Sequence, residues 1–154
     1  MKIGIISDTH VVNHRLIEVP GWVRDAFVGV DMIIHAGDVE LNDFLGELST
    51  IAPVYAVRGN CDLGAYDTPA ARSIEIGCGL LTVAHRAGTA RDALHPRSRV
   101  MVYGHTHIAL INQEENLLVI NPGSPTLPRG GLPASVALLH VNGDEIRAEL
   151  KQRP

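Results

Sequence analysis

The sequence has few aromatic residues and no excess of positive charge. Phe, Trp and Tyr make up 4% of its 154 residues, and the formal net charge is −4. A surface that binds nucleic acid broadly needs basic side chains for the phosphates and aromatic rings for the bases. The composition therefore disfavours a nucleic-acid partner and leaves only a local site of that kind open.

The sequence also lacks a long hydrophobic run and has only two cysteines. No apolar run approaches the roughly 20 residues that a membrane-spanning helix needs. We therefore expect no membrane partner and a cytoplasmic location. Cys61 and Cys78 could pair in principle, but thiols in a reducing compartment usually stay reduced, so we predict no disulfide.

What the sequence does have is the apolar content of a globular domain. Hydrophobic residues make up 45% of the chain and charged residues 19%, which predicts one domain over residues 1–154 with a core of its own. No pattern fixes the number of copies, so a homo-oligomer is left open.

Short apolar runs alternate with helical patterns in the first half of the chain. Residues 2–7, 31–35 and 54–57 are each typical of a buried strand that ends in polar residues. Between them, residues 22–28 and 41–51 place apolar side chains at helical spacing. This order predicts two right-handed β–α–β units with parallel strands.

The second half is predicted to be rich in β-structure. Extended runs separated by turn residues indicate three hairpins, at residues 73–84, 108–120 and 135–150. A further buried strand is expected at 100–103. Residues 122–133 are dense in Pro and Gly and form a long loop, and such loops inside compact domains are often functional.

Side chains that can bind metal follow the ends of several predicted strands. They occur in Asp8-Thr9-His10, Gly37-Asp38, Gly59-Asn60-Cys61-Asp62, His85 and Gly104-His105-Thr106-His107. Because ligands gather beyond the carboxyl ends of strands in open α/β sheets, we expect Asp8, Asp38 and Asn60 to meet in one crevice. Residues two apart in an extended segment project to the same side, so Asp8 should pair with His10, and His105 with His107.

The donor types in these motifs indicate a transition-metal site. Imidazole nitrogens mixed with carboxylate and amide oxygens suit Mn²⁺, Fe, Co²⁺, Ni²⁺ or Zn²⁺ better than Ca²⁺ or Mg²⁺. So many ligands exceed what one ion takes, whereas two ions roughly 3.5–4 Å apart and bridged by one carboxylate use them all. The candidate metal ligands are Asp8, His10, Asp38, Asn60, His85, His105 and His107.

These motifs also carry a family resemblance. From residue 3 to about residue 140 the sequence resembles the calcineurin-like metallophosphoesterases, and most of all their small bacterial and archaeal phosphodiesterase branch. The same fold serves as the retromer scaffold subunit in eukaryotes. The resemblance rests on Ser7-Asp8-Thr9-His10, His35-Ala36-Gly37-Asp38, Arg58-Gly59-Asn60-Cys61-Asp62, Gly104-His105-Thr106-His107 and Asn121-Pro122-Gly123-Ser124.

The resemblance implies a fold and a reaction. The fold is an α/β, four-layer αββα sandwich in which two mixed β-sheets pack face to face with helices outside. The reaction is hydrolysis of a small phosphodiester by metal-bound hydroxide, with two divalent ions per chain and manganese preferred. Asp8, His10 and His107 would hold the first ion, Asn60, His85 and His105 the second, and Asp38 would bridge them. The alternatives are a non-catalytic metal-binding scaffold and a nuclease.

Catalytic roles through the ions are expected of Asp38, Asn60 and His105. Cys61 stands where larger phosphatases of the superfamily carry a histidine, and a thiol is a poorer general acid than an imidazolium. This difference predicts a preference for diesters over alkyl monoesters. Cys61 itself has either a weak role in catalysis or none. Arg86 replaces a glycine that is usual in the family. Arg86 and Asn60 are the candidates for binding substrate phosphate, and the alternative is that the Arg86 side chain is simply solvated.

Other polar residues are expected to position the metal ligands or to have no role in the site. His35 either orients the ligands or only closes its strand with a hydrogen bond. Asp62 is expected to accept a hydrogen bond within its loop. His14, His95 and His140 lie in no motif and are given no functional role.

Overall fold

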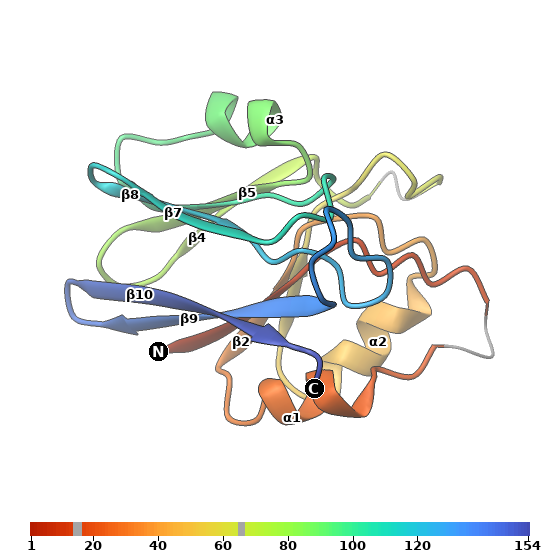
Figure 1. The fold of residues 1–154 in the computed structure, drawn as a ribbon. Coiled ribbons are helices and arrows are strands. Elements are labelled where there is room, and N and C mark those ends of the chain that lie inside the picture. Colours follow the sequence, from red (N-terminus) through yellow and green to blue (C-terminus); the bar gives the residue numbers. More distant parts are fainter. Residues whose placement is uncertain (14–16, 65–66) are drawn as a thin grey trace.

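The computed structural model describes residues 1–13, 17–64 and 67–154. Within them, two five-stranded sheets pack face to face, as Figure 1 shows. Helices α1 (Gly21–Ala26) and α2 (Asp43–Ser49) cover the first sheet, and α3 (Ala87–Asp92) covers the second. The four-layer αββα arrangement is therefore confirmed.

The first sheet has the strand order β10-β9-β1-β2-β3. Strands β1 (Lys2–Ile6), β2 (Met32–His35) and β3 (Val54–Ala56) run parallel, and α1 and α2 connect them, which confirms the two β–α–β units. The hairpin of β9 (Ser135–Asn142) and β10 (Glu145–Gln152) adds to the free edge of β1, where β9 pairs antiparallel. The carboxyl ends of β1, β2 and β3 consequently lie at one edge.

The second sheet has the order β4-β5-β6-β8-β7. Strands β4 (Ala71–Glu75) and β5 (Leu80–Ala84) form an antiparallel hairpin, as do β7 (Leu110–Glu114) and β8 (Leu117–Asn121). Strand β6 (Ser98–Val102) lies between the hairpins and runs parallel to β5 and β8. All three predicted hairpins are thus present, counting the one formed by β9 and β10.

The core is divided into layers by the pleat of the strands, which turns successive side chains to opposite faces. Ile3 and Ile5 of β1 pack between the sheets with Val100 and Val102 of β6. The intervening Met101 belongs instead to the small cluster with Ala90 of α3. On the outer face of the first sheet, the helices contribute Val23, Phe44 and Leu48, and Phe27 follows directly after α1.

Helix α3 is an element that the sequence pattern does not predict. Its six residues bury only Ala90, so the segment carries no apolar stripe that would mark a helix. The two predicted helices are present but shorter than expected. The differences lie at the helix ends, where assignment from sequence pattern is weakest.

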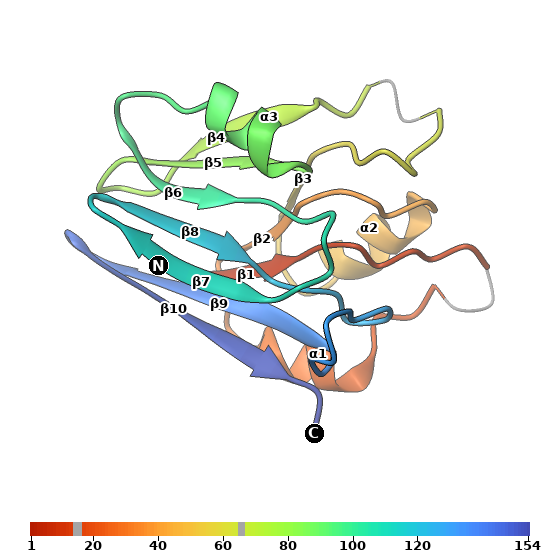
Figure 2. The same ribbon diagram turned by 45° about the horizontal axis from the view of Figure 1, so that its top comes forward.

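The loops that carry the motifs leave the sheets at one edge of the molecule. Figure 2 shows the segments after β1, β2 and β6 running to the same side of the sandwich. Among the described residues, none of the helices has the length and apolar character to span a bilayer. The cytoplasmic location stays a prediction.

Candidate metal centre

The loops at this edge bring the predicted ligands together. Nitrogen and oxygen atoms of Asp8, His10 and His107 lie within 4.8 Å of one another, and so do those of Asp8, Asp38 and His85. The two remaining ligands adjoin His85. The Asn60 Oδ1 atom lies 3.1 Å from its Nε2 atom, and the ring centroid of His105 lies 5.2 Å from its own.

Three of the histidines turn the same ring nitrogen, Nε2, toward the centre. Carbonyl and carboxylate oxygens only accept hydrogen bonds, so an Nδ1 atom facing one carries a proton, and a neutral ring then has its lone pair on Nε2. The acceptors are Glu40 Oε1 at 2.6 Å from His10 Nδ1, the Ala36 carbonyl at 2.8 Å from His85 Nδ1 and the Leu127 carbonyl at 2.7 Å from His107 Nδ1.

The Nε2 atoms converge on one another and on two carboxylates. His10 Nε2 and His107 Nε2 are 3.3 Å apart, and His107 Nε2 lies 3.4 Å from Asp8 Oδ1. His85 Nε2 lies 3.2 Å from Asp38 Oδ2. Lone pairs and carboxylates this close repel unless a cation or a proton lies between them. A divalent transition-metal ion fits this mixture of imidazole nitrogen and carboxylate oxygen.

Asp38 lies between the two groups. Its Oδ2 atom is 3.8 Å from His10 Nε2 and 3.2 Å from His85 Nε2, while its Oδ1 accepts the Cys61 backbone N–H at 2.8 Å. Burial alone would raise the pKa of Asp38, but hydrogen bonds from His85 and Cys61 outweigh it and hold the pKa below its usual value. The carboxylate is therefore ionised and suited to a bridging position.

His85 faces the same carboxylate. Burial alone would lower its pKa, but the hydrogen bond to Asp38 raises it. An ion bound here would have to displace any proton on Nε2, because metal-ligating imidazoles must be neutral.

Asp8 is the most enclosed of the carboxylates in the centre. It is 0% exposed, and burial raises its pKa even though the Ser7 hydroxyl donates a hydrogen bond to it at 2.7 Å. The backbone N–H of His105 donates to the same Oδ2 atom at 2.9 Å. These two donors hold the Asp8 carboxylate in a fixed orientation.

The ligand residues have an unusual backbone, which corrects one expectation. The angle φ is positive at Asp8 (54°), His10 (45°), Asp38 (56°), His105 (66°) and His107 (59°). The extended backbone assumed for the Asp8–His10 and His105–His107 segments is therefore wrong. As a result His107 joins Asp8 and His10, whereas His105 lies beside the ring of His85. Such sparsely populated conformations cluster at functional sites.

Two glycines allow these loops to approach each other. A Cβ atom on Gly59 would collide with the backbone nitrogen and carboxylate of Asp38. One on Gly104 would collide with the Ser7 hydroxyl and lie 2.6 Å from Asp8 Oδ2. Any larger residue at either position would displace a carboxylate of the centre.

Asp62 holds two of the ligand loops together. Its carboxylate accepts backbone N–H groups of Asp38 and Gly59 at 2.9 and 2.7 Å, and those of Val39 and Glu40 at 2.7 Å each. It thus links the loops after β2 and β3 and makes more contacts than the single hydrogen bond expected.

His35 and Ser124 support the loop after β1. His35 is buried, its Nε2 lies 3.1 Å from Thr9 Oγ1, and its Nδ1 accepts the Gly37 N–H at 3.2 Å. Burial lowers the pKa of His35 to about 4, so it is neutral at physiological pH. Ser124 donates its hydroxyl to the Asp8 carbonyl at 2.8 Å.

The side of the centre formed by Asn60 is open. Asn60 and Arg86 are exposed, and Arg86 Nη2 donates to Asn60 Oδ1 at 3.3 Å. The Asn60 amide donates to Cys61 Sγ at 3.3 Å. Burial and the neighbouring Asp38 raise the pKa of the Cys61 thiol, whereas burial and the charge of Arg86 lower the pKa of His105.

Glu40 is a residue of the centre that sequence reasoning misses. The only sign of it in the sequence is an acidic residue two positions after a predicted ligand, and many surface loops have one. In the structure its carboxylate fixes the His10 ring, and a Glu40 oxygen, a His10 nitrogen and Cys61 Sγ lie within 4.8 Å of one another. This group shares His10 with the group of Asp8, His10 and His107, so we assign it no ion of its own.

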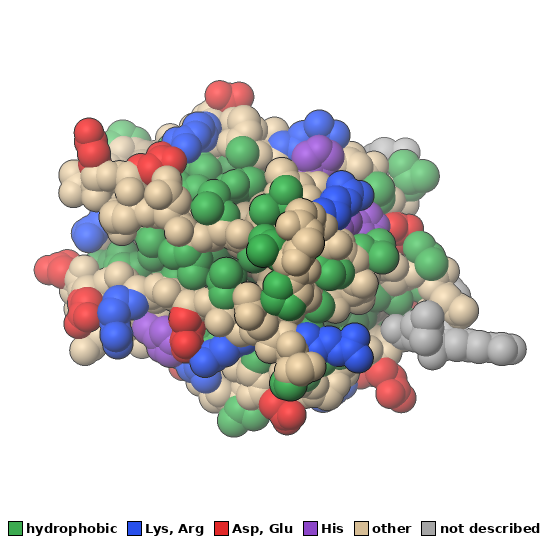
Figure 3. Space-filling view, in the orientation of Figure 1, with side chains coloured by type: hydrophobic (Ala, Val, Ile, Leu, Met, Phe, Trp, Pro, Cys, Tyr) green, Lys and Arg blue, Asp and Glu red, His purple; other side chains and the backbone are tan. Residues whose placement is uncertain are grey.

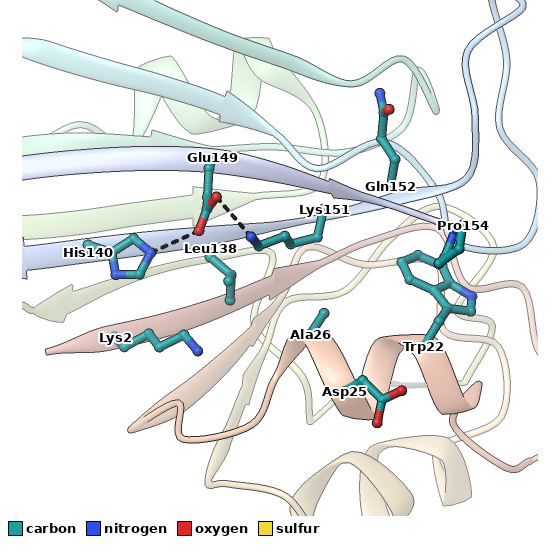
Figure 4. Close-up of a pocket in the computed structure, with 10 residues that line it drawn as sticks. All are labelled: Lys2, Trp22, Asp25, Ala26, Leu138, His140, Glu149, Lys151, Gln152 and Pro154. Carbon is teal, nitrogen blue, oxygen red and sulfur yellow. Dashed lines mark hydrogen bonds and ion pairs between the residues drawn. The ribbon is translucent and has the colours of Figure 1, made fainter.

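The other histidines and Cys78 lie outside the centre or outside the described residues. His95 Nδ1 accepts the Arg97 N–H at 3.0 Å, Cys61 and Cys78 are free thiols, and His14 lies outside the described residues. His140 lines a separate hollow of about 460 Å³ between α1 and the β9–β10 hairpin, where it lies 3.3 Å from Glu149 (Figure 4). No predicted ligand lines that hollow.

The chain is similar in sequence and in fold to known proteins. A family model described as the calcineurin-like phosphoesterase superfamily domain matches residues 1–144. A probable metallophosphoesterase from Methanothermobacter thermautotrophicus is 39% identical over 97% of this chain and 91% of its own. The structure of an archaeal phosphodiesterase, 26% identical, covers 98% of this chain and 100% of its own with a TM-score of 0.76. Vps29 from Chaetomium thermophilum, 16% identical over 99% and 97% of the chains, shares the fold with a TM-score of 0.78.

Proposed function

The chain belongs to the calcineurin-like phosphoesterase superfamily, and on that premise we propose that it is a phosphodiesterase that works with two divalent metal ions. One observation carries the proposal. The Nε2 atoms of His10, His85 and His107 converge on the carboxylates of Asp8 and Asp38, while Nδ1 of each ring faces an acceptor oxygen. That orientation leaves lone pairs for cations.

The ligands divide into two groups that share one carboxylate. Manganese is our first choice of metal, and Fe, Co²⁺, Ni²⁺ and Zn²⁺ suit the same donors. When bound, two such ions would supply Lewis acidity at the phosphate and lower the pKa of a water molecule. The first group is Asp8, His10 and His107, the second is Asn60, His85 and His105, and Asp38 is shared.

Arg86 and Asn60 are the residues that we assign to substrate phosphate. Both are exposed at the open side of the centre, and the contact of Arg86 with Asn60 Oδ1 places its guanidinium there. A guanidinium offers paired N–H donors that match two phosphate oxygens. Arg86 would therefore orient the ester and offset its charge.

Cys61 supports the preference for diesters. The Asn60 amide donates to Cys61 Sγ at 3.3 Å, so the thiol lies at the open side of the centre, where it could protonate a leaving group, but burial and Asp38 raise its pKa. Such a thiol gives up its proton less readily than an imidazolium. The protein should therefore favour diesters with a stable leaving group over alkyl monoesters.

Hydrolysis by metal-stripped protein reloaded with Mn²⁺, Ni²⁺, Zn²⁺ or Mg²⁺ tests the proposal. We expect bis(4-nitrophenyl) phosphate to be hydrolysed with higher kcat/KM than ethyl phosphate, and His107→Ala to lower that kcat/KM by at least about 100-fold. His140→Ala, a histidine outside the centre, is the matched control. If no ester is hydrolysed with any of these metals, the proposal is contradicted and a non-catalytic scaffold is favoured. If DNA or RNA is cleaved faster than the small diesters, a nuclease is favoured.

A further inference from the structure

Two hollows adjoin the metal centre on its opposite halves. One, of about 390 Å³, includes His10 in its wall. The other, of about 200 Å³, includes Asn60 and His85. Because each wall contains a proposed ligand, a molecule whose phosphate lies at the centre can extend into both.

The hollow beside His10 offers mainly hydrocarbon surface. Val11, Val12 and Leu127 line it, and the side chains of Val12 and Leu127 are 70% and 53% exposed. In Figure 3, hydrophobic side chains are exposed over the region of the loop between β8 and β9, the loop that contains Leu127. We call this space the apolar hollow.

The polar side chains in the wall of the apolar hollow are already engaged within the protein. Glu40 Oε1 is 2.6 Å from His10, the Thr126 hydroxyl donates to the Thr9 carbonyl at 2.9 Å, and the Thr9 hydroxyl is 3.1 Å from His35. A nucleobase would bury its own donors and acceptors against these occupied groups, which costs free energy. An alkyl or aryl group has no such penalty and buries apolar surface instead.

The hollow beside Asn60 has the opposite character. Arg58 and Arg86 line it, and among the described residues neither guanidinium lies within ion-pair distance of a carboxylate. The described partner of Arg86 is the neutral Asn60 Oδ1, at 3.3 Å. Two positive charges without a counter-charge attract an anion and bind carboxylate or phosphate oxygens well. We call this space the cationic hollow.

We propose that the substrate is a phosphodiester with two unlike arms, a hydrocarbon group in the apolar hollow and a second anionic group in the cationic hollow. This inference rests on the proposed function and names the substrate class of the same site. Leu127 and Val12 select the first arm and Arg58 the second. A symmetric or wholly polar diester would leave one of the two hollows without a matching group.

Binding of alkylphosphonates, which resist hydrolysis, tests the apolar arm without depending on activity. The Mn²⁺-loaded protein is titrated by calorimetry with methyl-, butyl- and hexylphosphonate. Since each buried methylene contributes up to about a fourfold gain in affinity, butylphosphonate should bind at least about tenfold tighter than methylphosphonate. Val12→Ser should abolish this gain and leave methylphosphonate binding unchanged. Val28→Ser, which changes a similarly exposed valine outside the hollow, is the matched control.

The anionic arm is tested with 3-phosphonopropionate, whose carboxylate can reach the cationic hollow. The wild type should bind 3-phosphonopropionate more tightly than ethylphosphonate. Arg58→Gln should weaken the binding of 3-phosphonopropionate about tenfold and leave the binding of ethylphosphonate unchanged. Arg97→Gln, which removes an exposed arginine paired with Glu75, is the control.

The outcomes separate the two proposals. If methylphosphonate does not bind a protein that has retained its Mn²⁺, the proposed function and the substrate class both fall. If methylphosphonate binds but the longer and the carboxylated phosphonates bind no tighter, only the substrate class is overturned. We expect Val12→Ser alone to lose the gain from chain length and Arg58→Gln alone to lose the gain from the carboxylate.

Discussion

The two halves of the metal centre differ in how completely the protein holds them. In the half formed by Asp8, His10 and His107, the side chains of Asp8 and His107 are 0% and 3% exposed, and both rings are fixed through Nδ1. In the other half Asn60 is exposed and His105 is half-buried. We call them the enclosed half and the open half.

This difference suggests separate tasks. Hydrogen bonds that fix a ligand in place raise metal affinity, because less conformational freedom is lost when the ion binds. The enclosed half should therefore retain its ion more tightly. The open half leaves room for a phosphate, and the arginine beside it carries the charge to attract one. Each of the following variants tests that contrast.

Asp38→Asn should have the largest effect, because it removes the charge shared by both halves. We expect metal affinity to fall in both halves and kcat/KM to drop by at least about 1000-fold. Metal content after desalting and diester hydrolysis measure the two effects. Asp144→Asn, an exposed acid in the β9–β10 turn, should behave as wild type. A protein that keeps both ions after Asp38→Asn would show that this carboxylate does not bridge.

Replacing a single ligand should weaken metal binding in one half of the centre and spare the other. We expect His85→Ala to lose the more weakly held ion and keep the tighter one, and His107→Ala to do the reverse, each with a loss of at least about 100-fold in kcat/KM. Competition with a chromophoric chelator measures the affinity of the ion that remains. Equal affinities in the two variants contradict the contrast between the halves.

Glu40→Gln tests the support behind the enclosed half alone. The amide cannot replace the carboxylate charge that holds His10 Nδ1–H, so affinity for the tighter ion should fall about 10- to 100-fold while the weaker ion is unaffected. Glu115→Gln is a matched control, since Glu115 also has positive φ but lies exposed in the β7–β8 turn. A fall in the weaker affinity instead would assign Glu40 to the open half.

His35 should produce a smaller effect, on stability. Burial lowers its folded pKa from 6.5 to about 4, so the folded state binds fewer protons than the unfolded state between these values. The stabilisation is complete above pH 6.5 and is lost as pH falls toward 4. In metal-free protein, the free energy of unfolding should drop by about 2 kcal/mol more in wild type than in His35→Gln between pH 7 and pH 5. Urea unfolding measures it, and parallel pH dependence in the two proteins would contradict this role.

The sequence is informative where structure follows from local pattern. Apolar runs and turn residues were enough to predict β1 to β3, the three hairpins and the loops with Asp8, Asp38 and Asn60, because strand ends and turns leave local signals. Helix α3 left none, since it buries only Ala90.

The arrangement inside the centre depends on backbone geometry that no local pattern reveals. Spacing alone placed His105 with His107, and positive φ at both residues separates them. The resemblance, not the spacing, implied their division between two ions. Glu40 was missed because its partner His10 comes from a loop distant in sequence. The role of each ligand stays a prediction until metal is measured.

The number of ions bound per chain, counted as Mn²⁺ is titrated into metal-free protein, tests the shared centre most directly. We expect two equivalents with different affinities, the tighter one weakened by Glu40→Gln and both weakened by Asp38→Asn. A single equivalent at saturation, or two equivalents that Asp38→Asn leaves unchanged, would contradict a centre in which two half-sites share Asp38.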